Sequence, residues 1–92
     1  MDISQVVANI LKDIDRYIND DKISKDQRGS YVMGSTMFLD DYEDIIAVEP
    51  MVEKLAETAS DLEITKDKRF VDLLFDEMTG IINQLKNKYQ NK

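Results

Sequence analysis

Apolar residues recur every three or four positions along most of this 92-residue chain, and polar residues fill the positions between them. Such spacing places apolar side chains on one face of an α-helix. It predicts four helices, at about 3–19, 25–39, a third that ends near 60, and 66–89. The third begins at either 43 or 50. Because the connections between them are short, the pattern predicts an all-α, antiparallel up-and-down four-helix bundle. Residues 1–92 should form a single helical domain.

The helix starts are marked by a signal that occurs twice. Residues 20–28 reappear in similar form as 61–69, a shift of 41 residues. In each copy a hydroxyl residue, Ser24 or Thr65, precedes a Lys-Asp pair, so both are predicted to be N-caps. Gln27 stands at the third helical position, which would complete a capping box with Ser24.

The last helix is the longest and most apolar, so it should lie at the centre of the core. We expect the following side chains to be buried there: Leu74, Met78, Ile81 and Leu85. Gly34, together with Ser30 and Ser35, would allow another helix to approach closely. Pro50 leaves two possibilities for the third helix, because proline is tolerated only in a first turn. Either the helix is kinked at Pro50, or a turn precedes it.

Composition argues against catalysis. The chain has no histidine and no cysteine, so it lacks the commonest general base and metal ligand, a thiolate nucleophile and a zinc–thiolate site. No serine begins a Ser-x-x-Lys motif, and the acidic run at 40–44 lacks the ligand spacing of a calcium-binding EF-hand loop. We therefore expect a protein that is not an enzyme and has no cofactor or metal.

The net charge of −7 is unevenly distributed. Residues 1–63 hold 6 Lys or Arg against 15 Asp or Glu, whereas residues 64–92 hold 6 against 4. A surface this acidic disfavours binding to nucleic-acid phosphates. The acidic start, Met1-Asp2, is unlike a signal peptide, and no apolar run approaches the ~20 residues that span a bilayer. A cytoplasmic protein without stable membrane insertion is expected.

Two segments carry a resemblance to a known family. The first is Ile23-Ser24-Lys25-Asp26-Gln27-Arg28, and the second is Leu39-Asp40-Asp41-Tyr42-Glu43-Asp44-Ile45-Ile46. In this order, between amphipathic helices, they resemble the immunity proteins of class IIa (pediocin-like) bacteriocins.

The resemblance implies a non-catalytic bacterial protein that protects the producer cell. Members of the family are cytosolic four-helix bundles, and they act with the sugar-uptake permease of the mannose phosphotransferase system, which the bacteriocin uses as its receptor. The implied partner-binding surface comprises the exposed faces of the last two helices and the C-terminal segment. In this chain that segment contains Lys86, Lys88, Tyr89 and Lys92.

The acidic residues support a different hypothesis. An acidic inhibitor or adaptor from a mobile element would bind a basic protein surface, and it could mimic nucleic acid. The residues that would bind are Asp40, Asp41, Glu43 and Asp44, with Asp20 and Asp21 in addition. A structural or oligomerisation module is also compatible with the sequence.

Overall fold

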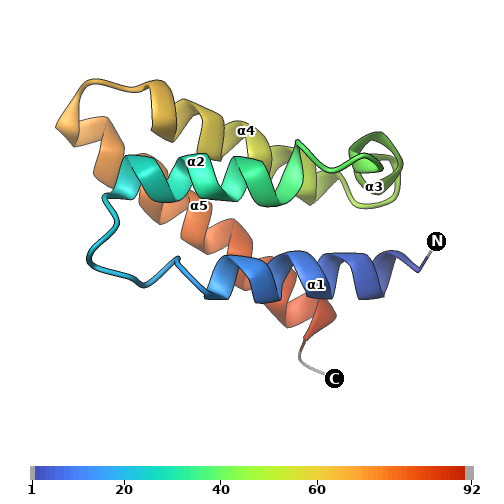
Figure 1. Cartoon of the computed structure of the whole chain (residues 1–92). Helices are drawn as coiled ribbons and strands as arrows, with labels where there is room; N and C mark the ends of the chain where they lie inside the picture. The colour runs from blue at the N-terminus through green and yellow to red at the C-terminus, as the bar shows by residue number, and fades with distance from the viewer. Residues whose placement is uncertain (1, 91–92) are drawn as a thin grey trace.

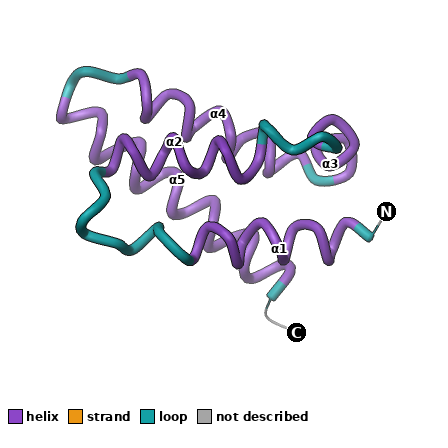
Figure 2. The backbone as a smooth tube through the Cα atoms, viewed as in Figure 1, coloured by secondary structure: helices purple, strands orange, loops and turns teal. Residues whose placement is uncertain are grey.

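The computed structural model describes residues 2–90 and contains five helices and no strand in that range. They are α1 (Ile3–Asp15), α2 (Lys25–Thr36), α3 (Tyr42–Val48), α4 (Pro50–Ile64) and α5 (Lys68–Tyr89) (Figures 1 and 2). The predicted all-helical fold is confirmed, but the predicted number of four helices is wrong.

The additional helix results from Pro50. Its ring occupies the first position of α4, where a missing N–H removes no hydrogen bond. The preceding residue, Glu49, leaves the helical region, with φ −127° and ψ 88°, and so separates α3 from α4. Of the two possibilities left by the sequence, a break before Pro50 is the one observed.

The four longer helices alternate in direction, as Figure 1 shows, but α5 runs obliquely across the others. Helix α2 packs most closely on α4, and α4 packs on α5, whereas α1 rests on α5 and α2. Helix α3 lies across the end of this group and packs on α4. The oblique α5 and the inserted α3 distinguish the arrangement from the regular bundle that the sequence predicts.

The core follows the apolar pattern in the middle of α1 and in the second half of α5. Helix α1 buries Val7, Ile10, Leu11 and Ile14, and α5 buries Met78, Ile81, Ile82 and Leu85. Leu74, which was also expected to be buried, is only half-buried. The first turns of α5 are more exposed than its second half, so the prediction for Leu74 is wrong.

The predicted N-cap at Ser24 is confirmed, and the one at Thr65 is wrong. The Ser24 hydroxyl accepts the backbone N–H of Gln27 at 3.4 Å. Thr65 instead follows the end of α4 in extended backbone, and Asp67 caps α5 by accepting the N–H of Arg69 at 3.0 Å. Threonine and aspartate are both good N-caps, and Thr65 and Asp67 are only two positions apart, so the sequence pattern alone selected the wrong one.

Close helix packing occurs at Gly29, not at Gly34 as expected. A Cβ atom at Gly29 would lie 2.9 Å from the backbone oxygen of Ala59 in α4, whereas at Gly34 no atom would lie within 4 Å. The absence of a side chain at Gly29 therefore allows α2 and α4 to approach each other. None of the helices within residues 2–90 has the length and apolarity needed to cross a membrane.

Candidate functional site

The C-terminal residues implied by the family resemblance make contacts within the molecule. The Lys88 ammonium and the Tyr89 hydroxyl both donate to Oε1 of Glu49, at 2.6 and 2.5 Å. Glu49 is 2% exposed and joins α3 to α4. Its other carboxylate oxygen accepts the N–H of Met51 at 3.4 Å. The end of α5 is thereby attached to the junction between α3 and α4.

These contacts determine the charge of the cluster. Burial alone would raise the pKa of Glu49, but the hydrogen bonds from Lys88 and Tyr89 outweigh it and hold the pKa below its ordinary value. The same hydrogen bond to Glu49 raises the pKa of the Lys88 ammonium. Burial, followed by the bond to Glu49, raises the pKa of the Tyr89 phenol. At neutral pH the cluster therefore contains an ionised carboxylate, an ammonium and a neutral phenol.

The remaining C-terminal candidates differ in position. Lys86 forms an ion pair with Asp15 of α1 at 2.6 Å, and Lys92 lies outside the described residues. The Lys88 side chain remains 59% exposed even though it binds Glu49. The contacts within the chain thus attach the end of α5 to α1 and to the α3–α4 junction, and they leave part of Lys88 on the surface.

The four acidic candidates lie together at the α2–α3 connection and the first turn of α3. They are Asp40, Asp41, Glu43 and Asp44. Within residues 2–90, none of these carboxylates forms an ion pair with a lysine or arginine. Asp20 and Asp21, by contrast, belong to the α1–α2 connection at the other end of α2, so the structure separates them from this group.

Tyr42 stands between Asp41 and Glu43 in the chain, and further acidic residues lie near it. Burial raises the pKa of the Tyr42 phenol, and the nearby carboxylates of Glu53, Glu57 and Glu43 raise it further. The acidic region thus extends from the α2–α3 connection onto the exposed side of α4. It forms one charged end of the molecule.

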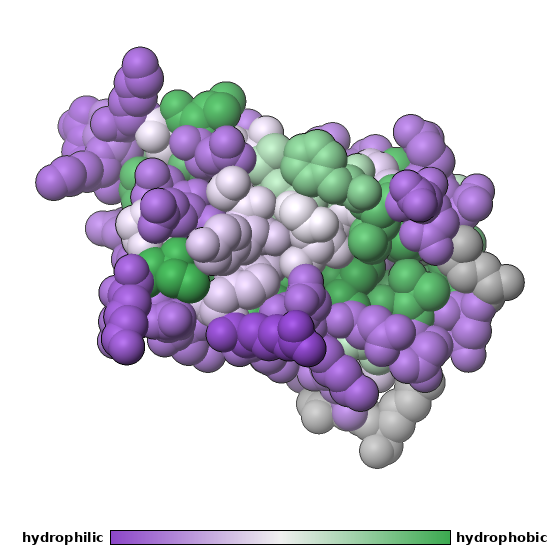
Figure 3. Space-filling model, viewed as in Figure 1, coloured by the Kyte–Doolittle hydropathy of each residue, from purple (hydrophilic) through white to green (hydrophobic). Residues whose placement is uncertain are grey.

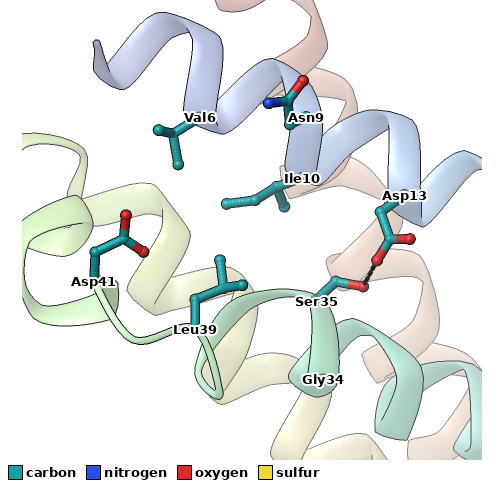
Figure 4. Close-up of a pocket in the computed structure, with 8 residues that line it drawn as sticks. All are labelled: Val6, Asn9, Ile10, Asp13, Gly34, Ser35, Leu39 and Asp41. Atoms are coloured by element: carbon teal, nitrogen blue, oxygen red, sulfur yellow. Dashed lines mark hydrogen bonds between the residues drawn. The ribbon is translucent and has the colours of Figure 1, made fainter. Parts of the chain in front are cut away.

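The sequence gives no indication of a groove that lies between α1 and the end of α2. Its volume is about 360 Å³. In Figure 4, Val6 and Ile10 of α1 face Leu39 across the groove, and Asp13 and Asp41 stand on its two sides. The space-filling view shows hydrophobic surface between α1 and α2 in this region (Figure 3). The groove therefore combines an apolar floor with a carboxylate on each side.

One side of the groove is held by a chain of hydrogen bonds. The Ser35 hydroxyl donates to Oδ2 of Asp13 at 2.5 Å, and it lies 3.0 Å from the Tyr17 hydroxyl. Because a serine hydroxyl has a single hydrogen, Tyr17 is the donor to Ser35. Burial raises the pKa of Tyr17 to about 12 and outweighs the lowering by the Ser35 hydrogen bond, and the Asp13 charge adds a smaller rise. Tyr17 therefore keeps its proton at physiological pH.

Large apolar side chains are exposed at the connection between α4 and α5. Ile64 is 69% exposed, Phe70 is 54% exposed and Leu73 is 63% exposed. Two other exposed apolar residues flank the acidic residues 40–44 along the chain: Phe38 precedes them and Val48 follows them. In Figure 1 the α4–α5 connection lies at the opposite end of the molecule from α3.

No cluster of side chains suited to bind a metal ion is found in the described part of the chain. Among residues 2–90, no three Asp or Glu side chains lie close enough together to hold a metal ion. Every buried side-chain nitrogen or oxygen in this range has a hydrogen-bond partner. The surface features that stand out in this range are the groove, the acidic end and the exposed apolar residues. Comparison of the chain with protein-family models, with curated proteins and with solved structures finds no match.

Proposed function

We propose that this chain is a non-catalytic cytoplasmic protein of a bacterial cell that binds another protein, and that it serves as a bacteriocin immunity protein. In this proposal α1, α2, α4 and α5 correspond to the four helices of the family that the sequence resembles. Helix α3 is an insertion relative to that plan. The partner is the sugar-uptake permease of the mannose phosphotransferase system.

The observation that supports this proposal best is the exposure of Ile64, Phe70 and Leu73 on the last two helices. The family resemblance implies that these helices contact the partner. Isolated exposed apolar residues are ordinary on protein surfaces, but here three of them lie within ten residues of the chain beside one connection. Burial of such side chains against a partner would stabilise a complex by the hydrophobic effect.

Expression of the chain in a bacteriocin-sensitive strain tests the proposal. The wild-type chain should confer resistance to a pediocin-like bacteriocin, measured as growth in its presence. Combined replacement of Phe70→Ser and Leu73→Ser should remove the resistance, because it removes apolar surface from α5. Phe38→Ser is the matched control, since Phe38 is 71% exposed but lies at the other end of the molecule, and it should leave resistance unchanged.

Circular dichroism of the purified variants verifies that they remain helical. A panel of sensitive strains in which the wild-type chain protects against no pediocin-like bacteriocin would remove the immunity proposal. Deletion of residues 86–92 is a poor test of the same idea, because it would also remove the Lys88 and Tyr89 contacts to buried Glu49.

A second candidate function is an acidic inhibitor or adaptor that binds a basic protein surface. The observation that favours it is the group of Asp40, Asp41, Glu43 and Asp44, which have no cationic partner among the described residues. Reversal of all four to lysine should abolish capture of the partner from a bacterial lysate. Capture by the wild-type chain should also weaken as salt is raised, because exposed charges are screened. Salt-insensitive capture that survives the reversal would exclude this function.

A further inference from the structure

We propose that the groove between α1 and α2 binds the apolar face of a basic amphipathic helix from a partner protein. The groove is formed by α1, α2 and the α2–α3 connection, and none of its residues belongs to α4 or α5. The inference therefore goes beyond the immunity proposal and does not depend on it.

The floor of the groove is suited to aliphatic side chains. Val6, Ile10 and Leu39 point toward one another in Figure 4, from α1 and from the segment that follows α2. Val6 and Leu39 are only partly buried, so part of their apolar surface remains in contact with solvent. A leucine or isoleucine side chain placed between them would remove that surface from water.

The sides of the groove select for positive charge. Asp13 and Asp41 lie on opposite sides, and no lysine or arginine lines the groove. The cation nearest to Asp13 in an ion pair is Arg16, which is 3.9 Å away and 82% exposed on its side chain. An acidic side chain in the partner would be repelled by both carboxylates, because no cation lies in the groove itself, whereas lysine or arginine would be attracted to both sides. The charge arrangement thus favours a basic segment over an acidic one.

The Asp13 carboxylate is oriented before any partner arrives. Ser35, which is 8% exposed, fixes one of its oxygens, and the half-buried Tyr17 hydroxyl fixes Ser35. The Tyr17 ring is in turn held edge-on against Tyr31, with the two ring centres 5.2 Å apart. A side chain that is already ordered loses little conformational entropy when a cation binds to it.

The shape of the groove favours a helix as the bound segment. Its two walls are α1 and the end of α2, and a third helix can lie along the channel between two others. In an amphipathic helix, apolar side chains three or four residues apart point to the same face. That face would meet Val6, Ile10 and Leu39, and lysines or arginines flanking it would reach Asp13 and Asp41.

Nuclear magnetic resonance of the whole, ¹⁵N-labelled chain tests the proposal with a defined probe. The probe is a synthetic amphipathic helix of about 15 residues made only of Leu and Lys, a length at which isolated helices become marginally stable. A helix with every Lys replaced by Glu is the control peptide. The Leu/Lys peptide should shift the amide signals of Val6, Ile10, Ser35 and Leu39, and the Leu/Glu peptide should not.

Two charge-matched double variants separate the groove from general attraction to an acidic protein. Asp13→Asn with Asp41→Asn should raise the Kd of the Leu/Lys peptide about tenfold, because two carboxylate–cation contacts are lost. Asp76→Asn with Glu77→Gln changes the net charge equally on the exposed side of α5 and should change the Kd less than about twofold. Equal weakening by both double variants would overturn the proposal.

A third variant tests the floor without disturbing the Tyr17–Ser35–Asp13 hydrogen bonds. Val6→Lys places a cation where the apolar face should bind, and it should abolish the shifts at Ile10 and Leu39 while thermal unfolding shows that the chain remains folded. Unchanged peptide binding to Val6→Lys would contradict the proposal. Shifts confined to residues 40–44, or equal binding of the Leu/Glu peptide, would contradict it as well.

Discussion

The carboxylate of Glu49 and the ammonium of Lys88 are 2.6 Å apart although 39 residues separate them along the chain. Glu49 is 2% exposed, so its buried negative charge depends on the hydrogen bonds that Lys88, Tyr89 and the N–H of Met51 donate to it. A buried ionised group is tolerated only when it is paired and hydrogen-bonded. The stability of the fold should therefore depend on both partners of this contact, Glu49 and Lys88.

Replacement of Glu49 should destabilise the fold. Glu49→Gln keeps the shape of the side chain but removes the charge that strengthens the bonds from Lys88 and Tyr89, so the free energy of unfolding should fall by about 1–3 kcal/mol. Chemical denaturation measures the change. Glu53→Gln is the matched control, because Glu53 is exposed on α4, and it should leave the stability nearly unchanged.

The same cluster predicts a pH dependence with a definite sign. The pKa of Glu49 is lower in the folded chain than its ordinary value of 4.5, so ionised Glu49 stabilises the fold fully above pH 4.5. This contribution is lost as the pH falls through the folded-state pKa. The difference in unfolding free energy between wild type and Glu49→Gln should therefore shrink below pH 4.5. A difference that stays constant down to the acid-unfolding region would contradict this assignment.

Alanine at two glycines of α2 should have opposite effects. A Cβ at position 29 would lie 2.9 Å from the Ala59 oxygen and 3.2 Å from the Leu62 side chain, so Gly29→Ala should cost about 1–3 kcal/mol by forcing α2 from α4. At Gly34 nothing lies within 4 Å, so Gly34→Ala should stabilise by about 0.5–1 kcal/mol through helix propensity. Thermal unfolding of both variants is the measurement, and a stabilising Gly29→Ala would refute the close contact.

The two hydroxyl residues first expected to be caps should respond differently to alanine. Ser24→Ala removes the acceptor for the Gln27 N–H and should cost about 1 kcal/mol. Thr65→Ala removes no cap bond, since Asp67 caps α5, so it should have a much smaller effect. Equal losses in denaturation experiments would show that Thr65 has a capping role that the structure does not assign to it.

Arg28 should be hard to replace even by lysine. It is 8% exposed, and its guanidinium donates to the carbonyl of Ile23 at 2.8 Å and to that of Ile18 at 3.1 Å, which fixes the α1–α2 connection. A lysine ammonium lacks the planar fork that reaches two carbonyls at once. Arg28→Lys should therefore cost about 1–3 kcal/mol. Arg16→Lys, at a largely exposed position, is the control and should be close to neutral.

The periodicity of apolar residues was sufficient to place the core of α1, because the three- and four-residue spacing of Val7, Ile10, Leu11 and Ile14 puts them on one helix face and all four are buried. The Ser-Lys-Asp capping signal was sufficient for the start of α2 at Ser24, because the cap and the first turn are local features. The periodicity failed at Leu74, since a pattern along one helix does not reveal how far the neighbouring helices extend beside it. Gly29 and Gly34 could not be distinguished for the same reason: only the position of α4 decides which of them is crowded.

Features that depend on contacts between distant segments were less accessible to sequence reasoning. Glu49 stands before a proline in an acidic chain and has no local signal for burial, which arises only when the end of α5 returns to it. The groove requires α1 and the α2–α3 connection to come together, so no motif could indicate it. The acidic group at 40–44 was visible because its members are adjacent in the sequence.

The attachment of α3 has a consequence for motion. Ile45 is the buried residue of this seven-residue helix, and α4 is its principal packing partner. An element held by so few contacts opens locally at a lower free energy than the global unfolding of the molecule. Its amide hydrogens should consequently exchange with solvent sooner than those of α4, and the acidic end, together with the Leu39 and Asp41 side of the groove, should rearrange while the rest of the fold stays closed.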